Sequence, residues 1–113
     1  MVVVASKMAL SLTTGLTSAD QVSGTYQFVP IGILRVYALG SATGMLITVL
    51  NNGLSLVNAQ AVPYFATTGT MKRADHLVLE QAVNPGRLEC YFTNPTGGTL
   101  TVDFIIEHIA TGK

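Results

Sequence analysis

The two histidines of this 113-residue chain are its best candidates for acid–base chemistry or metal binding. Asp75 precedes His76, and Glu107 precedes His108. Neighbours along a strand point to opposite faces, so neither acid–histidine pair can converge on one site if these segments are strands. His76 and Glu80 share a face, but they lie roughly 13 Å apart along a strand, too far for one metal ion. We therefore predict no catalytic residue, no metal site and no cofactor, and we expect both histidines to face solvent or a protein interface.

The single cysteine, Cys90, is a second potential reactive group. It excludes an intramolecular disulfide, and an unbridged thiol fits a reducing cytosol. Because Cys90 alternates with Leu88 and Phe92, we predict that it is a small buried hydrophobic residue and not a nucleophile.

Asp103 and Glu107 share the polar face of the last predicted strand, and Arg87 is a candidate partner for Asp103. A cross-strand ion pair of this kind orients strands or subunits and does no acid–base work.

Arg35 lies within the apolar segment between Leu34 and Val36. A buried guanidinium without a partner is costly, so we expect Arg35 to pair with Asp103, Glu107 or a residue of a neighbouring subunit. The alternative is that Arg35 faces solvent on an edge strand.

Motifs for binding phosphate or nucleic acid are missing from the sequence. The glycine-bracketed segment 40–44 lies between predicted strands and indicates a turn, and no Gly-x-Ser-x-Gly motif occurs. The only adjacent basic pair, Lys72-Arg73, is followed closely by Asp75, which favours a solvated loop. Nucleic-acid binders need clustered basic residues, so we expect no direct contact with nucleic acid.

The composition points to assembly. Charged residues make up 11% of the chain, against roughly 25% in average proteins, and the formal net charge is zero. Soluble monomers usually keep a net charge, whereas the cores of protein interfaces are depleted in charge. We therefore predict that other protein covers much of the surface. A monomer with a surface rich in Thr, Ser, Asn and Gln is the alternative.

Alternation of apolar and polar residues predicts strands throughout the chain. Leu100, Val102, Phe104 and Ile106 form one face of the last strand, and a turn at 94–98 joins it to the strand before. Asn52-Gly53 is the strongest hairpin signal. The predicted strands are 7–13, 25–29, 33–39, 45–50, 54–60, 76–83, 87–93 and 99–109.

This pattern predicts an all-β protein with one antiparallel β-sandwich domain over residues 7–113, and we expect an eight-stranded jelly roll. An immunoglobulin-like sandwich is the nearest competitor, although the chain has no Trp and no second Cys. The segment 33–39 is apolar on both faces apart from Arg35, as in a strand covered on both sides.

Two segments are predicted to make contacts between subunits. Residues 1–6, with Val2, Val3 and Val4, form either an arm that adds a strand to a neighbouring subunit or an early beginning of the first strand. The segment 61–74 is a long loop whose Tyr64 and Phe65 either anchor a partner or plug the end of the sandwich. Residues 14–24 are predicted as a surface loop.

No segment reads as a membrane helix or a signal peptide. The first residues lack a positively charged leader, and the most apolar stretch, 28–39, is short and interrupted by Pro30, Gly32 and Arg35. We expect a soluble protein without contact with a membrane.

The chain resembles the small jelly-roll subunits of viruses and phages. The resemblance rests on a compact run of strands that ends in a hairpin, Leu88-Glu89-Cys90-Tyr91-Phe92-Thr93-Asn94 followed by Thr99-Leu100-Thr101-Val102-Asp103-Phe104-Ile105-Ile106. It implies a structural protein, not an enzyme: a shell, vertex or decoration subunit of a capsid that assembles in the host cytoplasm and contacts its own copies and other capsid proteins. The chain departs from many RNA-packaging coat proteins because it has no basic arm.

Two other classes of function stay open. A β-sandwich that binds carbohydrate or another ligand would need exposed aromatic residues or a calcium cluster, and the chain has no Trp. A small enzyme on a β-barrel is the third class.

Overall fold

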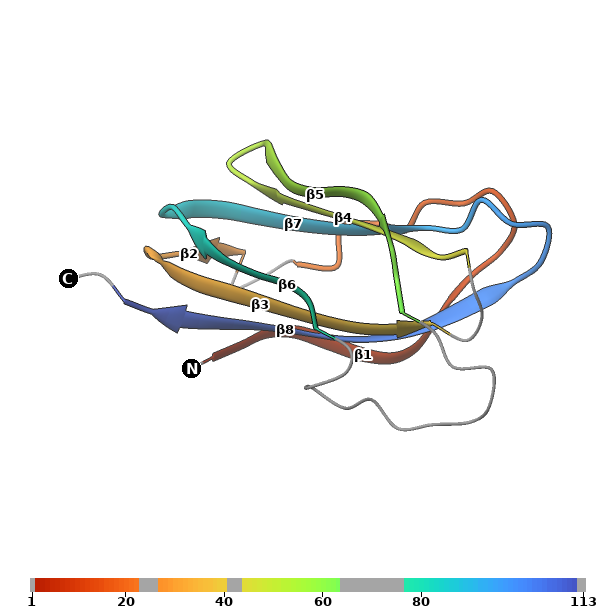
Figure 1. Cartoon of the computed structure of the whole chain (residues 1–113), viewed down its shortest axis with the longest axis horizontal. Coiled ribbons are helices and arrows are strands. Elements are labelled where there is room, and N and C mark those ends of the chain that lie inside the picture. The colour runs from red at the N-terminus through yellow and green to blue at the C-terminus, as the bar shows by residue number, and fades with distance from the viewer. Residues whose placement is uncertain (1, 23–26, 41–43, 64–76, 112–113) are drawn as a thin grey trace.

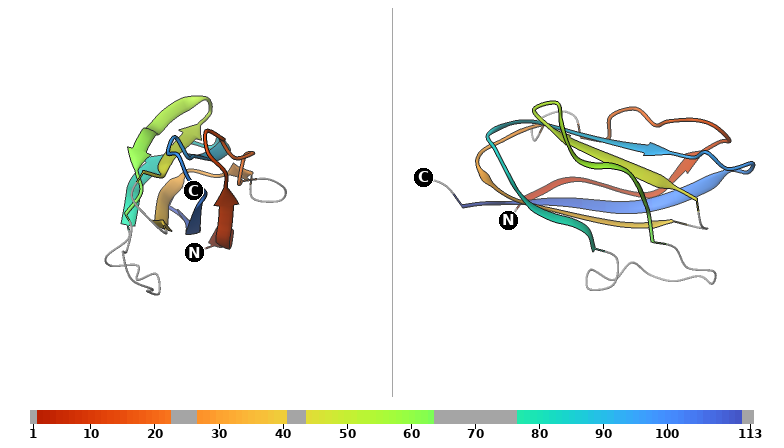
Figure 2. Two further views of the ribbon diagram at one scale, coloured as in Figure 1. Left: turned by 90° about the vertical axis from the view of Figure 1, so that its right-hand side faces the viewer. Right: turned by 45° about the horizontal axis from the view of Figure 1, so that its top comes forward.

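The computed structural model describes residues 2–22, 27–40, 44–63 and 77–111, and this part of the chain contains strands and no helix. Two four-stranded antiparallel sheets lie face to face in an elongated body (Figures 1 and 2). The predicted β-sandwich is thus confirmed, and each predicted segment contains a strand. The strands are β1 (Val2–Leu12), β2 (Phe28–Val29), β3 (Gly32–Gly40), β4 (Leu46–Asn51), β5 (Leu54–Ala61), β6 (Leu77–Val83), β7 (Gly86–Thr93) and β8 (Leu100–Ala110).

The strand pairs are nested around the β4–β5 hairpin. The first sheet has the order β1-β8-β3-β6, and the second sheet has the order β2-β7-β4-β5. Working outward from the hairpin, β4 pairs with β5, β3 with β6, β2 with β7 and β1 with β8, all antiparallel. Except at that hairpin, each strand is followed by one in the opposite sheet. All the connections between successive strands, apart from the β4–β5 hairpin, therefore cross from one sheet to the other.

The first strand begins earlier than the predicted 7–13. Residues 2–6 belong to β1, where Val3 lies opposite Glu107 and Ser6 opposite Ile105 of β8. Of the two interpretations of residues 1–6, the described residues 2–6 therefore fit the early beginning of the strand. Bulges interrupt the pairing after Val3 and after Lys7.

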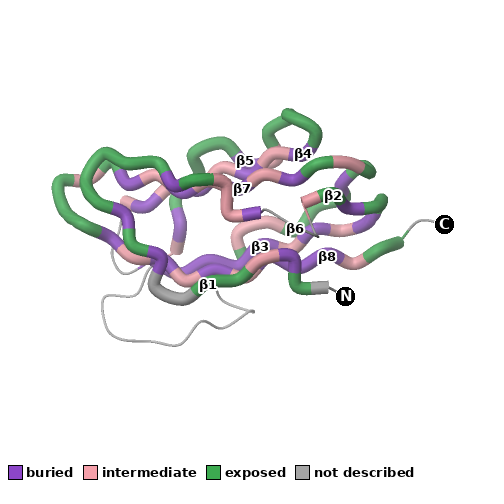
Figure 3. Tube along the Cα trace, turned by 180° about the vertical axis from the view of Figure 1, so that it is seen from behind, coloured by how far each residue is buried: buried purple, intermediate pink, exposed green. Residues whose placement is uncertain are grey.

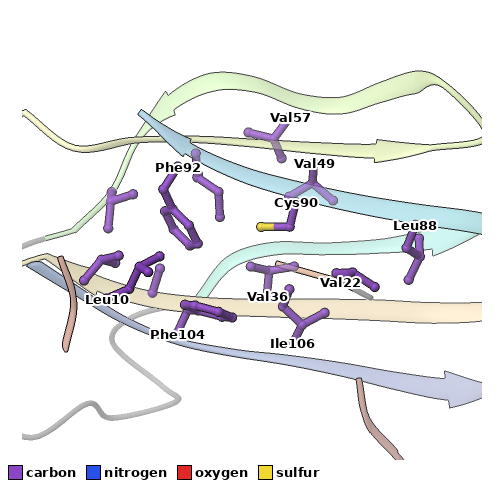
Figure 4. Close-up of a cluster of buried hydrophobic side chains, with 14 of the residues drawn as sticks. Leu10, Val22, Val36, Val49, Val57, Leu88, Cys90, Phe92, Phe104 and Ile106 are labelled. Carbon is purple, nitrogen blue, oxygen red and sulfur yellow. The ribbon is translucent and has the colours of Figure 1, made fainter. Parts of the chain in front are cut away.

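The core lies between the sheets and is built by alternate residues of the inner strands. Side chains from β4 and β7, including Val49 and Cys90, point toward Val36 and Ile106 on the first sheet (Figure 4). The rings of Phe92 and Phe104 meet across the gap with centroids 5.1 Å apart. The predicted inward faces of β7 and β8 are therefore confirmed as part of the core. Each fully buried Val, Leu, Ile or Phe stabilises the fold by roughly 1.5–3 kcal/mol.

The outer edge of β7 is covered by the segment before β2. Because β2 is two residues long, most of this edge lies beside residues 15–22. Ser18 Oγ accepts a hydrogen bond from the backbone N–H of Phe92 at 2.9 Å, and Asp20 Oδ1 accepts one from the N–H of Cys90 at 3.0 Å. The backbone N–H groups of Ser18 and Gln21 donate to the carbonyls of β7 in return. The predicted surface loop thus also shields a strand edge that would otherwise be unpaired.

Asn94, in the turn between β7 and β8, makes a cluster of hydrogen bonds at one end of the sandwich. Its fully buried side chain donates from Nδ2 to the carbonyls of Leu12 and Gly98, at 2.9 and 2.7 Å. Its Oδ1 accepts hydrogen bonds from the backbone N–H and the hydroxyl of Thr96. One amide therefore connects the end of β1 to the turn between β7 and β8.

Replacing Asn94 with Ala should lower the free energy of unfolding by about 1–3 kcal/mol, because the carbonyls of Leu12 and Gly98 lose the hydrogen bonds that the amide donates. Urea denaturation followed by circular dichroism measures this loss. Asn58→Ala, at an exposed position on β5, is the control and should change stability by less than about 0.5 kcal/mol. Equal stabilities of the two variants would contradict the role of Asn94.

Candidate interaction surface

The outer face of the first sheet, meaning the side of β1, β8, β3 and β6 that points away from the core, is unusually apolar. In an antiparallel sandwich the side of a sheet away from the core is normally polar. Here the inner strand β3 presents Ile33, Tyr37 and Leu39 at outward positions, opposite residues of β8 that also point outward. The outward apolar residues of this face are Val3, Ile33, Tyr37, Leu39, Leu77, Ile105 and Ile109.

The burial of this face is uneven (Figure 3). Tyr37 and Leu39 are each only 6% exposed, although their side chains point away from the core. Val3 on β1 and Leu77 on β6 are 45% and 42% exposed. The prediction that β3 is covered on both sides is therefore confirmed at Tyr37 and Leu39, while apolar surface stays open at both flanking strands.

Arg35 crosses this face toward β6. Its Nε lies 2.5 Å from Oε2 of Glu80, the residue opposite it in the register. The hydrogen bond and the charge of Glu80 raise the pKa of Arg35 above its ordinary value. Glu80 was not among the predicted carboxylate partners, Asp103 and Glu107, because it comes from β6, the other neighbour of β3. The edge-strand alternative is wrong, since β3 lies inside the sheet.

Glu107 lies opposite Arg35 on the β8 side and is 1% exposed. Its charge contributes to the raised pKa of Arg35, after the larger effect of Glu80. The two carboxylates and the guanidinium therefore form a charged row across this face, and Asp103 lies on the same face opposite Leu39.

The outer face of the second sheet, formed by β2, β7, β4 and β5, is more polar. Arg87 Nη2 lies 3.5 Å from Glu89 Oε1 and 3.9 Å from Asp20 Oδ2. The Tyr91 hydroxyl donates to Glu89 at 2.9 Å, which raises the pKa of that tyrosine. The predicted pairing of Arg87 with Asp103 is wrong, because these residues lie in different sheets. These polar side chains share the face with apolar residues, since Phe28 of β2 lies opposite Arg87 and is 66% exposed.

His108 is buried at the end of β8, contrary to the expectation that it faces solvent or a protein interface. Its side chain points to the same side of β8 as the core residues Phe104 and Ile106. Its Nε2 lies 2.9 Å from the carbonyl oxygen of Pro30. The closely approaching backbone of Gly32 leaves no room for a side chain there. His108 thus supports the turn between β2 and β3.

Cys90 is fully buried, as predicted. Burial raises the pKa of its thiol from 9.0 to about 12, because the thiolate would lose its hydration, and the charge of Asp20 adds to this shift. Such a thiol is a poor nucleophile at neutral pH.

The other predicted interface residues differ in how far their side chains are exposed. Val3 is exposed, and Val4 is buried in the chain's own core. For Val2 only the backbone pairing, with His108, is described. Tyr64 and Phe65, like Lys72, Arg73, Asp75 and His76, lie outside the described residues.

Sequence reasoning missed Ser18 and Asp20, which cover the edge of β7. A signal for Asp20 was present, since an Asp can accept a hydrogen bond from the N–H two residues later, as it does here from Val22.

Neither a metal site nor a membrane helix is found in the part of the chain that the structure covers. Within residues 2–22, 27–40, 44–63 and 77–111, no group of three or more His, Cys, Asp or Glu residues is placed to hold a metal ion. No helix among these residues is long and apolar enough to cross a membrane. Comparison with protein-family models, curated proteins and solved structures finds no match to this chain.

The raised pKa of Cys90 predicts a loss of stability in alkali. Between pH 9 and about 12 the unfolded thiol releases its proton while the folded one keeps it. The stabilising effect is therefore complete below pH 9 and is lost as the pH rises. We expect wild-type protein to lose up to about 1.4 kcal/mol per pH unit more than Cys90→Ala across this range.

Urea denaturation at a series of pH values measures both slopes. The two proteins share all tyrosines, lysines and arginines, so their difference isolates the thiol, whatever the cavity in the variant costs. Parallel pH profiles would show that Cys90 titrates normally.

Proposed function

We propose that this chain is a structural subunit that assembles with copies of itself and with other proteins in the capsid of a virus or phage. The single observation that carries the proposal is the apolar outer face of the first sheet. A face with open apolar residues at Val3 and Leu77, on a chain with 11% charged residues, gains free energy when another protein covers it.

The nested strand order supports a jelly roll as the finer description of the sandwich. A jelly roll has eight strands in two sheets, and viral capsid proteins are among its users. Rolling a long hairpin of eight strands around its own axis produces the pairs β4·β5, β3·β6, β2·β7 and β1·β8. The additional pairs β8·β3 and β7·β4 then close each sheet.

The two outer faces suggest how such a subunit is oriented. The outer face of the second sheet carries the ion pairs of Arg87 beside the exposed ring of Phe28. The outer face of the first sheet suits contact with a second copy, because it exposes the apolar Val3 and Leu77, and its Arg35 is paired with Glu80 within the chain.

The proposal predicts that the purified protein is larger than its 11.9 kDa monomer in solution. Light scattering over a range of concentrations should show a defined oligomer or a particle. Val3→Lys introduces a charge on the outer face of the first sheet and should weaken association by about tenfold or more.

Ser55→Lys is the matched control. Ser55 is also exposed, but it lies on the outer face of the second sheet, opposite Leu50 of β4. A wild-type monomer at every concentration, or equal effects of the two lysine variants, would argue against assembly through this face.

A further inference from the structure

Two turns at the end of the sandwich that carries both chain termini are fastened to each other (Figure 1). The β4–β5 turn contributes Asn51 and Asn52, and the β6–β7 turn contributes Asn84, Pro85 and the beginning of β7. Asn51 Nδ2 donates to the carbonyl of Asn84 at 3.2 Å, and Asn51 Oδ1 accepts from the N–H of Asn84 at 3.0 Å. We call this set of contacts the turn clamp.

Asn52 forms the outer half of the turn clamp. Its Nδ2 donates to the carbonyl of Pro85 at 3.0 Å, and its Oδ1 accepts from the N–H of Arg87 at 3.0 Å. Its backbone N–H donates to the carbonyl of Arg87 at 2.9 Å. Gly86 allows this approach, because a Cβ at that position would overlap the side-chain amide of Asn52. Both polar atoms of the amide are therefore occupied by backbone groups of another turn.

Asn52 is also followed by glycine, in the sequence context that most favours deamidation. Asn52 and Gly53 have φ values of 54° and 81°, as a two-residue hairpin turn requires. Both residues are exposed to water, and nothing lies within 4 Å of a Cβ placed on Gly53. The Asn52-Gly53 turn is therefore open to solvent in the folded protein.

The chemistry needs only water. The Gly53 nitrogen gives its proton to solvent base and bonds to Cγ of Asn52. The Cγ–Nδ2 bond then breaks, and the nitrogen leaves with a proton from solvent as ammonia. Water opens the resulting succinimide at either carbonyl, giving aspartate or isoaspartate. The reaction removes Nδ2, which donates to the Pro85 carbonyl in the turn clamp, so this hydrogen bond has to break for Asn52 to react.

We propose that Asn52 is a deamidation site gated by the turn clamp, and that its reaction releases the β4–β5 turn from the β6–β7 turn. An aspartate at 52 would place a carboxylate oxygen against the carbonyl of Pro85, where a donor was needed. An isoaspartate would lengthen the backbone of a two-residue turn whose flanking residues, Asn51 and Leu54, are paired. Either product adds a negative charge to a chain with a formal net charge of zero. This inference does not depend on the proposed function.

The test is peptide mapping by mass spectrometry after incubation of the full chain in mildly alkaline buffer. Conversion of Asn52 in the folded wild-type protein should be slower than in urea-denatured protein by about tenfold or more, because two hydrogen bonds have to open first. Asn51→Ala loosens the turn clamp without altering the Asn52-Gly53 dipeptide, and should speed conversion by at least about threefold in the folded protein.

The chain contains its own controls. Asn58, before Ala59 on the edge strand β5, lies outside the turn clamp, and its rate should not change in Asn51→Ala while the protein stays folded. Asn84 and Asn94 precede prolines, which lack the N–H that cyclisation needs, so neither should react by this path.

Equal rates at Asn52 in folded and denatured wild-type protein would overturn the gating. If Asn51→Ala unfolds, the rates at Asn52 and Asn58 will rise together. The test is then the rate of conversion at Asn52 in wild-type protein at low urea concentrations. Conversion at Asn52 that rises below the global unfolding transition supports opening of the turn clamp, whereas conversion that rises only with global unfolding overturns it.

Discussion

The position of β8 between β1 and β3 is the constraint on which the rest of the structure depends. β8, the last strand, pairs with the first strand, β1, and on its other side with β3, so it lies in the middle of the first sheet. Its inward residues Val102, Phe104 and Ile106 form one side of the core. Its outward residues, including Ile105 and Glu107, make the face that we propose as the assembly surface. Because these pairs join residues far apart in the sequence, they cost chain entropy early in folding, and we expect slow folding typical of sandwiches.

The contrast between the two outer faces follows from the same arrangement. In the second sheet, residues 15–22 and the ion pairs of Arg87 protect an inner strand with local polar contacts. In the first sheet, Glu80, Arg35 and Glu107 form one charged row, Asp103 lies opposite Leu39, and apolar residues occupy many positions that an isolated sheet would give to water. Exposed apolar residues nevertheless occur on both sheets, at Val3 and Leu77 of the first and at Phe28 and Leu54 of the second.

Much of the fold could be predicted from the sequence because alternation is a local property. The inward faces of β7 and β8, the buried Cys90 and the Asn52-Gly53 turn all follow from residues close together in the chain. The partners of the charged residues could not be predicted in this way. Arg35 pairs with Glu80, and Arg87 lies in a different sheet from Asp103, because ion pairs depend on which strands become neighbours. Likewise, the burial of His108 depends on Pro30 in another part of the chain.

The central claim is that copies meet through the outer face of the first sheet, and spin labels on the two faces test it most directly. Ser6→Cys places a label on this face, and Ser55→Cys places one on the outer face of the second sheet; both sites are exposed, while Cys90 is buried. Dipolar distance measurements on assembled protein should find short distances between copies for Ser6→Cys and longer ones for Ser55→Cys. Short distances for Ser55→Cys alone, or none for either label, would contradict the account.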